Sequence, residues 1–280
     1  MEFESEKKFV EWSECITLKH PNVQCVAGIL NARREEGQSL RGLDVGGGIG
    51  TFASHVCTLV PDSRITIIDK SALAREGFSK NPALNFIEGD FLTLDESQQF
   101  DFIIMKTVLH HFIGEGEQET RANQKAGLAK ARRLLKPDGV LIVEENFYED
   151  LFGRDLIGRL ILFLTQPRLI EPLIRRLGAN TAGEGVRFRS YSGWKALFAE
   201  AGFGIDNMHE SAHWGKDFPL WQRLPLMCKR RFQAILTMSK APIREAYPAA
   251  ARSYRRVKHT IAAVAALSAL AFVAYREAEA

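Results

Sequence analysis

A run of glycines behind a carboxylate is the first place where this sequence could bind a ligand. Asp44 is followed by Gly46, Gly47, Gly48 and Gly50, and the run lies between a short apolar stretch and a helix-like stretch. Glycines let a backbone turn sharply and approach a ligand closely, and the first turn of a helix offers free N–H groups. The spacing therefore predicts a ligand-binding turn between a strand and a helix.

The charge beside this turn indicates what kind of ligand it holds. A dinucleotide-binding turn has the spacing G-x-G-x-x-G, whereas here Gly46, Gly48 and Gly50 form G-x-G-x-G and Thr51 takes the place of the third glycine. A pyrophosphate needs N–H donors, so a carboxylate at Asp44 disfavours it and favours a positively charged sulfonium or ammonium group. The simpler alternative is that Asp44 only caps a helix.

Further acids follow the next two predicted strands. Asp69 comes 23 residues after Gly46, where a carboxylate accepts hydrogen bonds from both hydroxyls of a ribose. Asp90 and Phe91 end the third strand and suit the amino group and ring face of an adenine. We also include Lys70 and Lys106 in the predicted cofactor site. Taken singly, each acid could be a turn residue and Phe91 a core aromatic.

The elements that must position these residues alternate along the chain. A polar helical stretch covers about 117–135 and stops at the turn 136–139. Strands alternating with helices predict parallel βαβ units and a sheet covered on both faces. The predicted strands begin near residue 41 and then cover 64–70, 84–91, 100–109, 140–147, 203–211 and 232–240.

The order of these motifs resembles that of the class I S-adenosylmethionine-dependent methyltransferases. The matching segments are LDVGGGIG, IIDKS, EGDF, FDFIIMKTVLHHF and LLKPDGVLIVEEN. The resemblance implies an α/β, Rossmann-like, doubly wound sheet of seven strands, mostly parallel with one antiparallel strand (232–240), and helices on both faces. It also implies that S-adenosyl-L-methionine is the cofactor, with Asp44 and Gly46 to Gly50 at its methionine end, Asp69 at the ribose, and Asp90 with Phe91 at the adenine.

Three domain-level segments follow from this interpretation. Residues 1–38 form an N-terminal helical segment, with amphipathic stretches around 9–18 and 23–34. Residues 39–240 form the methyltransferase domain, in which 147–187 is a helical lid. Residues 241–280 form a basic linker and an apolar C-terminal helix.

The sequence says less about the residues that bind the methyl acceptor. Methyl transfer mainly requires alignment of the acceptor, and a base only when the acceptor must lose a proton. The candidates are His110 and His111 after the fourth strand and Glu144 after the fifth, where Glu145 and Tyr148 also lie. No acid–base set is evident from spacing alone, and either histidine could be a packed residue. The acceptor atom (O, N, C or S) stays open.

Apolar residues in the lid indicate a small, hydrophobic or aromatic acceptor, although ordinary helix packing would also explain them. A nucleic-acid methyltransferase is disfavoured, because residues 105–108 (MKTV) carry no N/D-P-P-Y/F motif. The glycine turn also allows a non-catalytic cofactor-binding scaffold or, less readily, a nicotinamide oxidoreductase. The lid residues concerned are Leu156, Leu160, Phe163, Leu164, Leu169, Leu173 and Leu177.

The composition of the chain indicates where in the cell the protein is expected to lie. The four cysteines form no C-x-x-C pair, and the charged N-terminus is no secretory signal, so we expect a cytoplasmic protein without a metal site. Residues 223–258 carry ten basic side chains and one acid, and 261–275 carry no charge. Fifteen helical residues span about 22 Å, short of a bilayer core of roughly 30 Å. We expect 255–275 to be a tail anchor, to lie at a membrane surface, or to pack on the domain.

Overall fold

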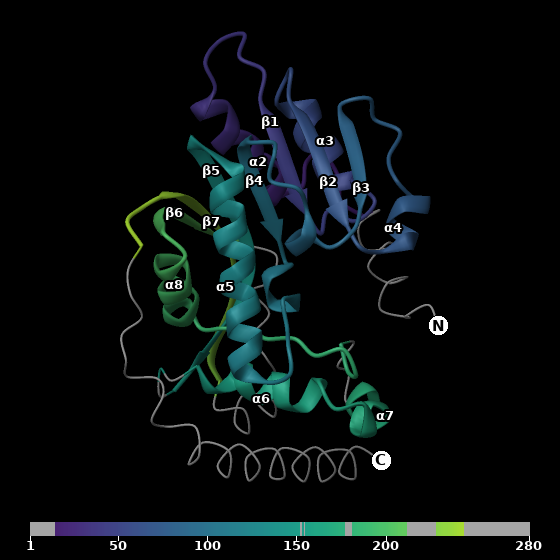
Figure 1. Ribbon diagram of the computed structural model, residues 1–280, viewed down its shortest axis with the longest axis vertical. Coiled ribbons are helices and arrows are strands. Elements are labelled where there is room, and N and C mark those ends of the chain that lie inside the picture. Colours follow the sequence, from purple (N-terminus) through teal and green to yellow (C-terminus); the bar gives the residue numbers. More distant parts are fainter. Residues whose placement is uncertain (1–14, 152, 154, 177–180, 212–227, 244–280) are drawn as a thin grey trace.

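The computed structural model describes residues 15–151, 153, 155–176, 181–211 and 228–243 (Figure 1). In this part of the chain seven strands form one sheet, in the order β3-β2-β1-β4-β5-β7-β6. The strands are β1 (Arg41–Val45), β2 (Arg64–Asp69), β3 (Leu84–Glu88), β4 (Phe100–Lys106), β5 (Leu135–Asp150), β6 (Phe203–Glu210) and β7 (Cys228–Lys240).

Helices connect most of these strands. Three short 3₁₀ turns, η1 (Phe91–Thr93), η2 (Leu109–His111) and η3 (Arg168–Ile170), lie between them. The α-helices are α2 (Pro21–Arg33), α3 (Thr51–Leu59), α4 (Ala72–Glu76), α5 (Glu117–Leu134), α6 (Leu156–Thr165), α7 (Glu171–Arg176) and α8 (Tyr191–Glu200).

The direction of the strands confirms the predicted fold. Strands β3, β2, β1, β4 and β5 pair in parallel, and β7 runs antiparallel to both of its neighbours, β5 and β6. The strand order reverses at β1, which pairs with β2 on one side and β4 on the other. In sheets of this type ligands bind beyond the carboxyl ends of the strands at this reversal, which is where the glycine turn lies.

Two apolar layers enclose the sheet. On one face, side chains of α2 and α3 such as Val23, Leu30 and Val56 pack against Ile67 and Ile104. The opposite face packs against the buried stripes of α5 and α8. Figure 1 shows α6 and α7 beyond the sheet, at the end where α5 begins. Helices therefore cover both faces, as the sequence predicts.

The structure differs from the expected boundaries in three places. The turn predicted at 136–139 lies within β5 as a bulge, because Phe100 pairs with Leu135 and Phe102 with Val140. Strand β5 continues to Asp150 and pairs with a β7 that begins at Cys228, so 147–150 is strand and not lid. Residues 15–20 are not helical, so the predicted stretch 9–18 is wrong where the structure describes it.

Candidate cofactor and acceptor site

The glycine turn has a backbone that other residues would strain. Gly46 and Gly50 have φ angles of 70° and 84°, in the left-handed region that favours glycine. A Cβ on Gly46 would lie 2.6 Å from Val108, and one on Gly47 would lie 2.6 Å from the Asp44 carboxylate. The turn therefore brings its backbone against Asp44 and the loop after β4, and Gly50 leads directly into α3.

Asp44 is a buried carboxylate at the end of β1. The residue is 1% exposed, and its Oδ1 has no hydrogen-bond partner among the described residues. Burial raises the pKa of Asp44 to about 7; Lys106 opposes the shift, while Asp69 and Glu144 add to it. A buried acceptor without a donor is costly unless a ligand supplies one. Asp44 is therefore suited to a cationic ligand.

Lys106 and Glu144 lie beside each other on the same sheet face as Asp44. They pair in the register of β4 and β5, and Lys106 Nζ lies 3.8 Å from Glu144 Oε1. Burial raises the pKa of Glu144, and Lys106 opposes that shift. Asp44 thus has one lysine, Lys106, and two further carboxyl groups, Asp69 and Glu144, acting on it, and this surplus of acidic groups disfavours a pyrophosphate.

Asp69 holds the glycine turn to the end of β2. Its Oδ2 accepts a hydrogen bond from the Gly48 N–H at 2.9 Å, and its Oδ1 accepts one from the Ser71 N–H at 2.9 Å. Each carboxylate oxygen can accept a further bond, so contact with ribose hydroxyls is still open to it. Lys70, which follows, is exposed.

The two residues predicted to contact the adenine lie in positions that favour this contact less. Asp90 is exposed and caps η1, where its Oδ1 accepts a hydrogen bond from the Leu92 N–H at 2.7 Å. Phe91 is 5% exposed and belongs to the core between the sheet and α5. Its ring lies 6.2 Å from that of Phe112. The geometry of Phe91 favours a packing role, and a role for Asp90 at the adenine stays a prediction.

A buried histidine–carboxylate pair lies on the other face of the sheet. His110 Nδ1 is 2.8 Å from Glu145 Oε2, and the His110 N–H donates to Glu145 Oε1 at 3.3 Å. Both side chains are buried. Successive residues of a strand point to opposite faces, so the side chains of Glu144 and Glu145 lie on opposite faces of the sheet. The spacing of the sequence did not indicate this pair, and Glu144, which was grouped with the histidines, lies beside Lys106 on the other face.

Aromatic rings extend from this pair. Phe188 stacks near His110 with ring centroids 4.4 Å apart, and Tyr148 follows at 4.9 Å from Phe188. The ring of His111 also lies close to that of His110, with centroids 4.3 Å apart. His111 is exposed, and its pKa is lowered, chiefly by desolvation of the ring and further by the neighbouring His110 and Lys70. The rings form an aromatic wall beside the histidine.

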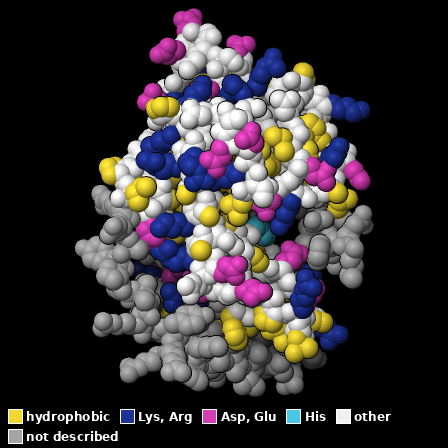
Figure 2. Space-filling view, viewed as in Figure 1, with side chains coloured by type: hydrophobic (Ala, Val, Ile, Leu, Met, Phe, Trp, Pro, Cys, Tyr) yellow, Lys and Arg dark blue, Asp and Glu magenta, His cyan; other side chains and the backbone are white. Residues whose placement is uncertain are grey.

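Only part of the predicted lid faces inward. Leu160 is buried together with Ile157 and Leu162, whereas Phe163 and Leu169 are 44% and 93% exposed. Figure 2 shows hydrophobic side chains gathered near the position of α7 in Figure 1. Leu156 and Leu164 are half-buried; the side chain of Leu173 and all of Leu177 lie outside what the structure describes.

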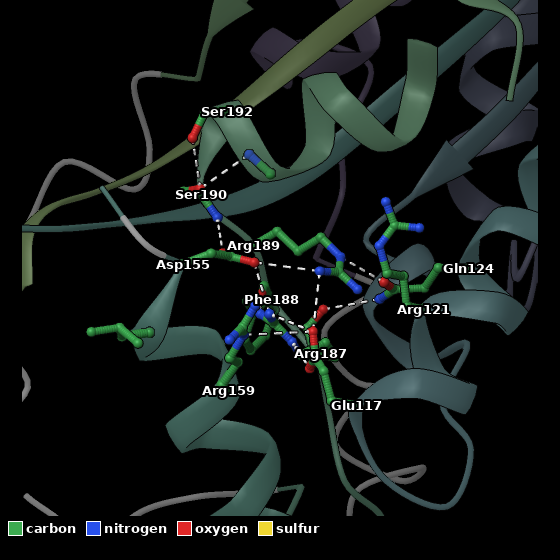
Figure 3. Close-up of polar contacts among 12 residues, drawn as sticks. Glu117, Arg121, Gln124, Asp155, Arg159, Arg187, Phe188, Arg189, Ser190 and Ser192 are labelled. Atoms are coloured by element: carbon green, nitrogen blue, oxygen red, sulfur yellow. Dashed lines mark hydrogen bonds and ion pairs between the residues drawn. The ribbon is translucent and has the colours of Figure 1, made fainter. Parts of the chain in front are cut away.

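Sequence reasoning missed a set of charged residues behind His110. Glu117, Asp155, Arg187 and Arg189 form a buried network of ion pairs (Figure 3). Arg187 and Glu117 are 70 positions apart, so no local spacing could have indicated the pairing.

The described residues also bear on metal binding and membrane insertion. Among them, no three His, Cys, Asp or Glu side chains are grouped as metal ligands. Nor does any described helix combine the length and apolar character needed to cross a bilayer. The predicted membrane segment 255–275 lies outside the described residues.

A sheet of this order, with a glycine turn and buried carboxylates at its point of reversal, defines the class I methyltransferase fold. Residues 43–141 match the family model described as a methyltransferase domain. This match runs from within β1 into β5, so it includes the glycine turn and Asp44.

Similar proteins include enzymes that methylate small molecules and one that methylates RNA. Isoflavone 7-O-methyltransferase of Glycyrrhiza echinata is 27% identical over 165 residues, covering 58% of this chain and 40% of that protein. Ribosomal RNA large subunit methyltransferase G of Shewanella amazonensis is 30% identical over 129 residues, covering 43% and 33%. The solved mitomycin 7-O-methyltransferase MmcR aligns over 77% of this chain and 53% of its own, with 19% identity and a TM-score of 0.47. The chain spans less than half the length of these curated relatives.

Proposed function

We propose that this protein transfers a methyl group from S-adenosylmethionine to a hydroxyl oxygen of a small aromatic acceptor, with His110 as the base. The observation that carries the proposal is the buried contact of 2.8 Å between His110 Nδ1 and Glu145 Oε2. The names of several relatives, among them the isoflavone and cephaeline O-methyltransferases, support an oxygen acceptor on an aromatic compound.

The residues around the glycine turn fit the cofactor. The unpartnered Oδ1 of Asp44 and the turn that a Cβ would obstruct are suited to a ligand with positive charge and close backbone contact. We assign Asp44 and Gly46 to Gly50 to the methionine end and Asp69 to the ribose. When bound, S-adenosylmethionine supplies a methyl group activated by positively charged sulfur.

His110 provides what an oxygen acceptor needs in addition. A hydroxyl must lose its proton when its oxygen is methylated, and a neutral imidazole nitrogen can accept that proton. Glu145 accepts the hydrogen bond at Nδ1, which selects the tautomer with its lone pair on Nε2. Nε2 then accepts the proton of the hydroxyl group, and Glu145 stabilises the resulting positive charge.

The surroundings of His110 favour a flat acceptor. Phe188 and Tyr148 present aromatic rings next to the histidine, and aromatic pairs prefer stacked or edge contacts at these separations. Phe188 is only half-buried, so part of its ring is open to a bound molecule. This arrangement supports an aromatic acceptor over an aliphatic one.

The test uses the full chain and cofactor carrying a labelled methyl group. We expect label to enter 7-hydroxyisoflavone, and none to enter 7-methoxyisoflavone, which is matched in shape but has no free hydroxyl. His110→Asn should abolish transfer, while His111→Asn should keep it. Labelling of ribosomal RNA with none in a panel of phenols would contradict the proposal. Cofactor binding without transfer to any acceptor would instead support the non-catalytic scaffold.

A further inference from the structure

Behind His110 lies a buried set of polar residues that we call the Arg187 network: Glu117, Gln124, Asp155, Arg187 and Arg189. Arg187 Nε donates to Glu117 Oε2 at 2.6 Å, and Arg187 Nη2 donates to Glu117 Oε1 at 3.0 Å and to Asp155 Oδ2 at 2.7 Å. The side chain of Arg187 is 0% exposed. Figure 3 shows Arg187 and Arg189 both directed toward these two carboxylates.

The network is joined directly to the loop that carries the histidine. The Arg187 N–H donates to the carbonyl oxygen of His110 at 2.9 Å. Gln124 Nε2 donates to the carbonyl oxygens of Leu109 and Arg187 at 3.2 and 3.1 Å. Arg189 Nε in turn donates to Gln124 Oε1 at 2.8 Å. The backbone on both sides of the His110 amide is thus tied to residues 187–189.

The same network holds the start of α6. Asp155 immediately precedes this helix, and its Oδ1 accepts a hydrogen bond from the Ser190 N–H at 2.6 Å. A Cβ on Gly158 would collide with the carbonyl of Phe188, so the helix backbone packs directly on the 187–188 segment. Helix α6, the 187–190 segment and the histidine loop are therefore joined through one set of contacts.

The histidine ring itself contacts one residue of the 187–190 segment. Glu145 fixes Nδ1, and the ring of Phe188 lies against the ring of His110. We infer that Arg187 is a positioning residue for His110: its ion pairs with Glu117 and Asp155 seat Phe188 against the imidazole and thereby orient the base. The inference rests on the proposed function, in which His110 is that base. Misplacement of a base by a small distance strongly reduces the rate of the chemical step.

The experiment compares Arg187→Met and Phe188→Leu with the wild type. Arg187→Met removes the ion pairs, while Arg189 still lies near Glu117 and Asp155. Phe188→Leu leaves the ion pairs intact and removes only the ring. The first readout is the proton NMR resonance of the His110 Nδ1–H, which a short hydrogen bond to a carboxylate shifts downfield and which His110→Asn identifies. The second readout is kcat with 7-hydroxyisoflavone, alongside the Kd of S-adenosylmethionine.

Two control variants separate positioning from general loss of stability. Arg133→Met removes an arginine that pairs with Glu96 through two hydrogen bonds of 2.7 Å each, near the other end of α5. Leu30→Ala creates a cavity in the core on the opposite face of the sheet, which lowers stability without touching the network. Neither control should change the resonance or kcat.

We expect both test variants to broaden or lose the resonance and to lower kcat by about tenfold or more, while the Kd of the cofactor changes by less than about twofold. An unchanged resonance and kcat in folded Arg187→Met would overturn the inference. If Arg187→Met does not fold, an unchanged resonance and kcat in Phe188→Leu would overturn the inference in the same way. A wild type that shows the resonance but methylates no phenol would contradict the proposed function alone, because the resonance reports positioning without turnover.

Discussion

The carboxylate of Glu145 lies 2.8 Å from Nδ1 of His110, although the two residues are 35 positions apart in the chain. The preceding residue, Glu144, points to the opposite face of the sheet and lies beside Lys106. Under the proposed function, Glu145 therefore belongs to the acceptor half of the site and Glu144 to the cofactor half.

Substitution of these two glutamates should have unequal effects on the chemical step. Glu145→Gln removes the charge that orients and stabilises His110, and we expect kcat to fall on the order of 10²-fold. Glu144→Gln leaves that pair intact, so kcat should stay within about threefold of the wild type. Initial rates with labelled cofactor and 7-hydroxyisoflavone measure both. An equal or larger loss in Glu144→Gln would show that the base has been assigned to the wrong face.

Cofactor affinity should depend on pH through Asp44. The pKa of its carboxyl is raised to about 7, chiefly by burial, so the group is mostly protonated below that pH and mostly ionised above it. A cationic ligand requires the ionised form, so the Kd of S-adenosylmethionine should be about tenfold weaker at pH 6 than at pH 8. Calorimetric titration across this range measures the effect. Asp44→Asn should bind more weakly at pH 8 and show a flat profile; an unaltered slope in that variant would exclude Asp44 as the titrating group.

The same carboxyl should affect the stability of the ligand-free protein. The pKa of the Asp44 carboxyl in the folded protein is raised above the ordinary value of 3.8. Its contribution to folding stability is therefore fully present below pH 3.8 and is lost as the pH rises through about 7. At pH 8 the wild type bears the cost of an ionised buried group, up to about 4 kcal/mol. We therefore expect Asp44→Asn to unfold at a higher temperature than the wild type at pH 8 and to lose that advantage near pH 4. A variant less stable at pH 8 would contradict this assignment.

Replacing glycine by alanine should destabilise the protein in the glycine turn and stabilise it at an ordinary helix position. Gly50 has a φ of 84°, and a Cβ there would lie 2.8 Å from Ile67, so Gly50→Ala should cost at least about 1–2 kcal/mol. Gly28 lies inside α2 with open space around it, so Gly28→Ala should stabilise by roughly 0.5–1 kcal/mol. Urea unfolding of the two variants gives both values. Equal effects would mean that Gly50 is not under backbone strain.

The fold could be predicted from the sequence because its signals are local. Alternating strands and helices, and a glycine run between the first strand and its helix, specify parallel βαβ units without knowledge of distant contacts. The bounds of α5 were predicted to within one residue, since the polar helical pattern ends abruptly before the sequence Lys136-Pro137-Asp138-Gly139. That sequence forms a bulge within β5 because Val140 resumes pairing with Phe102.

The site could be predicted only in part, because its contacts join distant segments. The alternation of side chains along β5 could have separated Glu144 from Glu145, but which face carries His110 depends on the path of η2. Phe91 follows a strand end as expected, yet its ring turns into the core against α5. Nothing in the sequence indicated the role of Arg187, since Glu117 and Asp155 lie 70 and 32 positions away in the chain and only the tertiary fold brings them together.

Titration calorimetry of the full chain with S-adenosylmethionine, S-adenosylhomocysteine and NAD is the most direct measurement of the central claim. The carboxylates around the glycine turn predict saturable one-to-one binding of the first two compounds and no binding of NAD, with affinity for S-adenosylmethionine reduced in Asp44→Asn and Asp69→Ala. Binding of NAD without binding of S-adenosylmethionine, or affinity untouched in both variants, would contradict it.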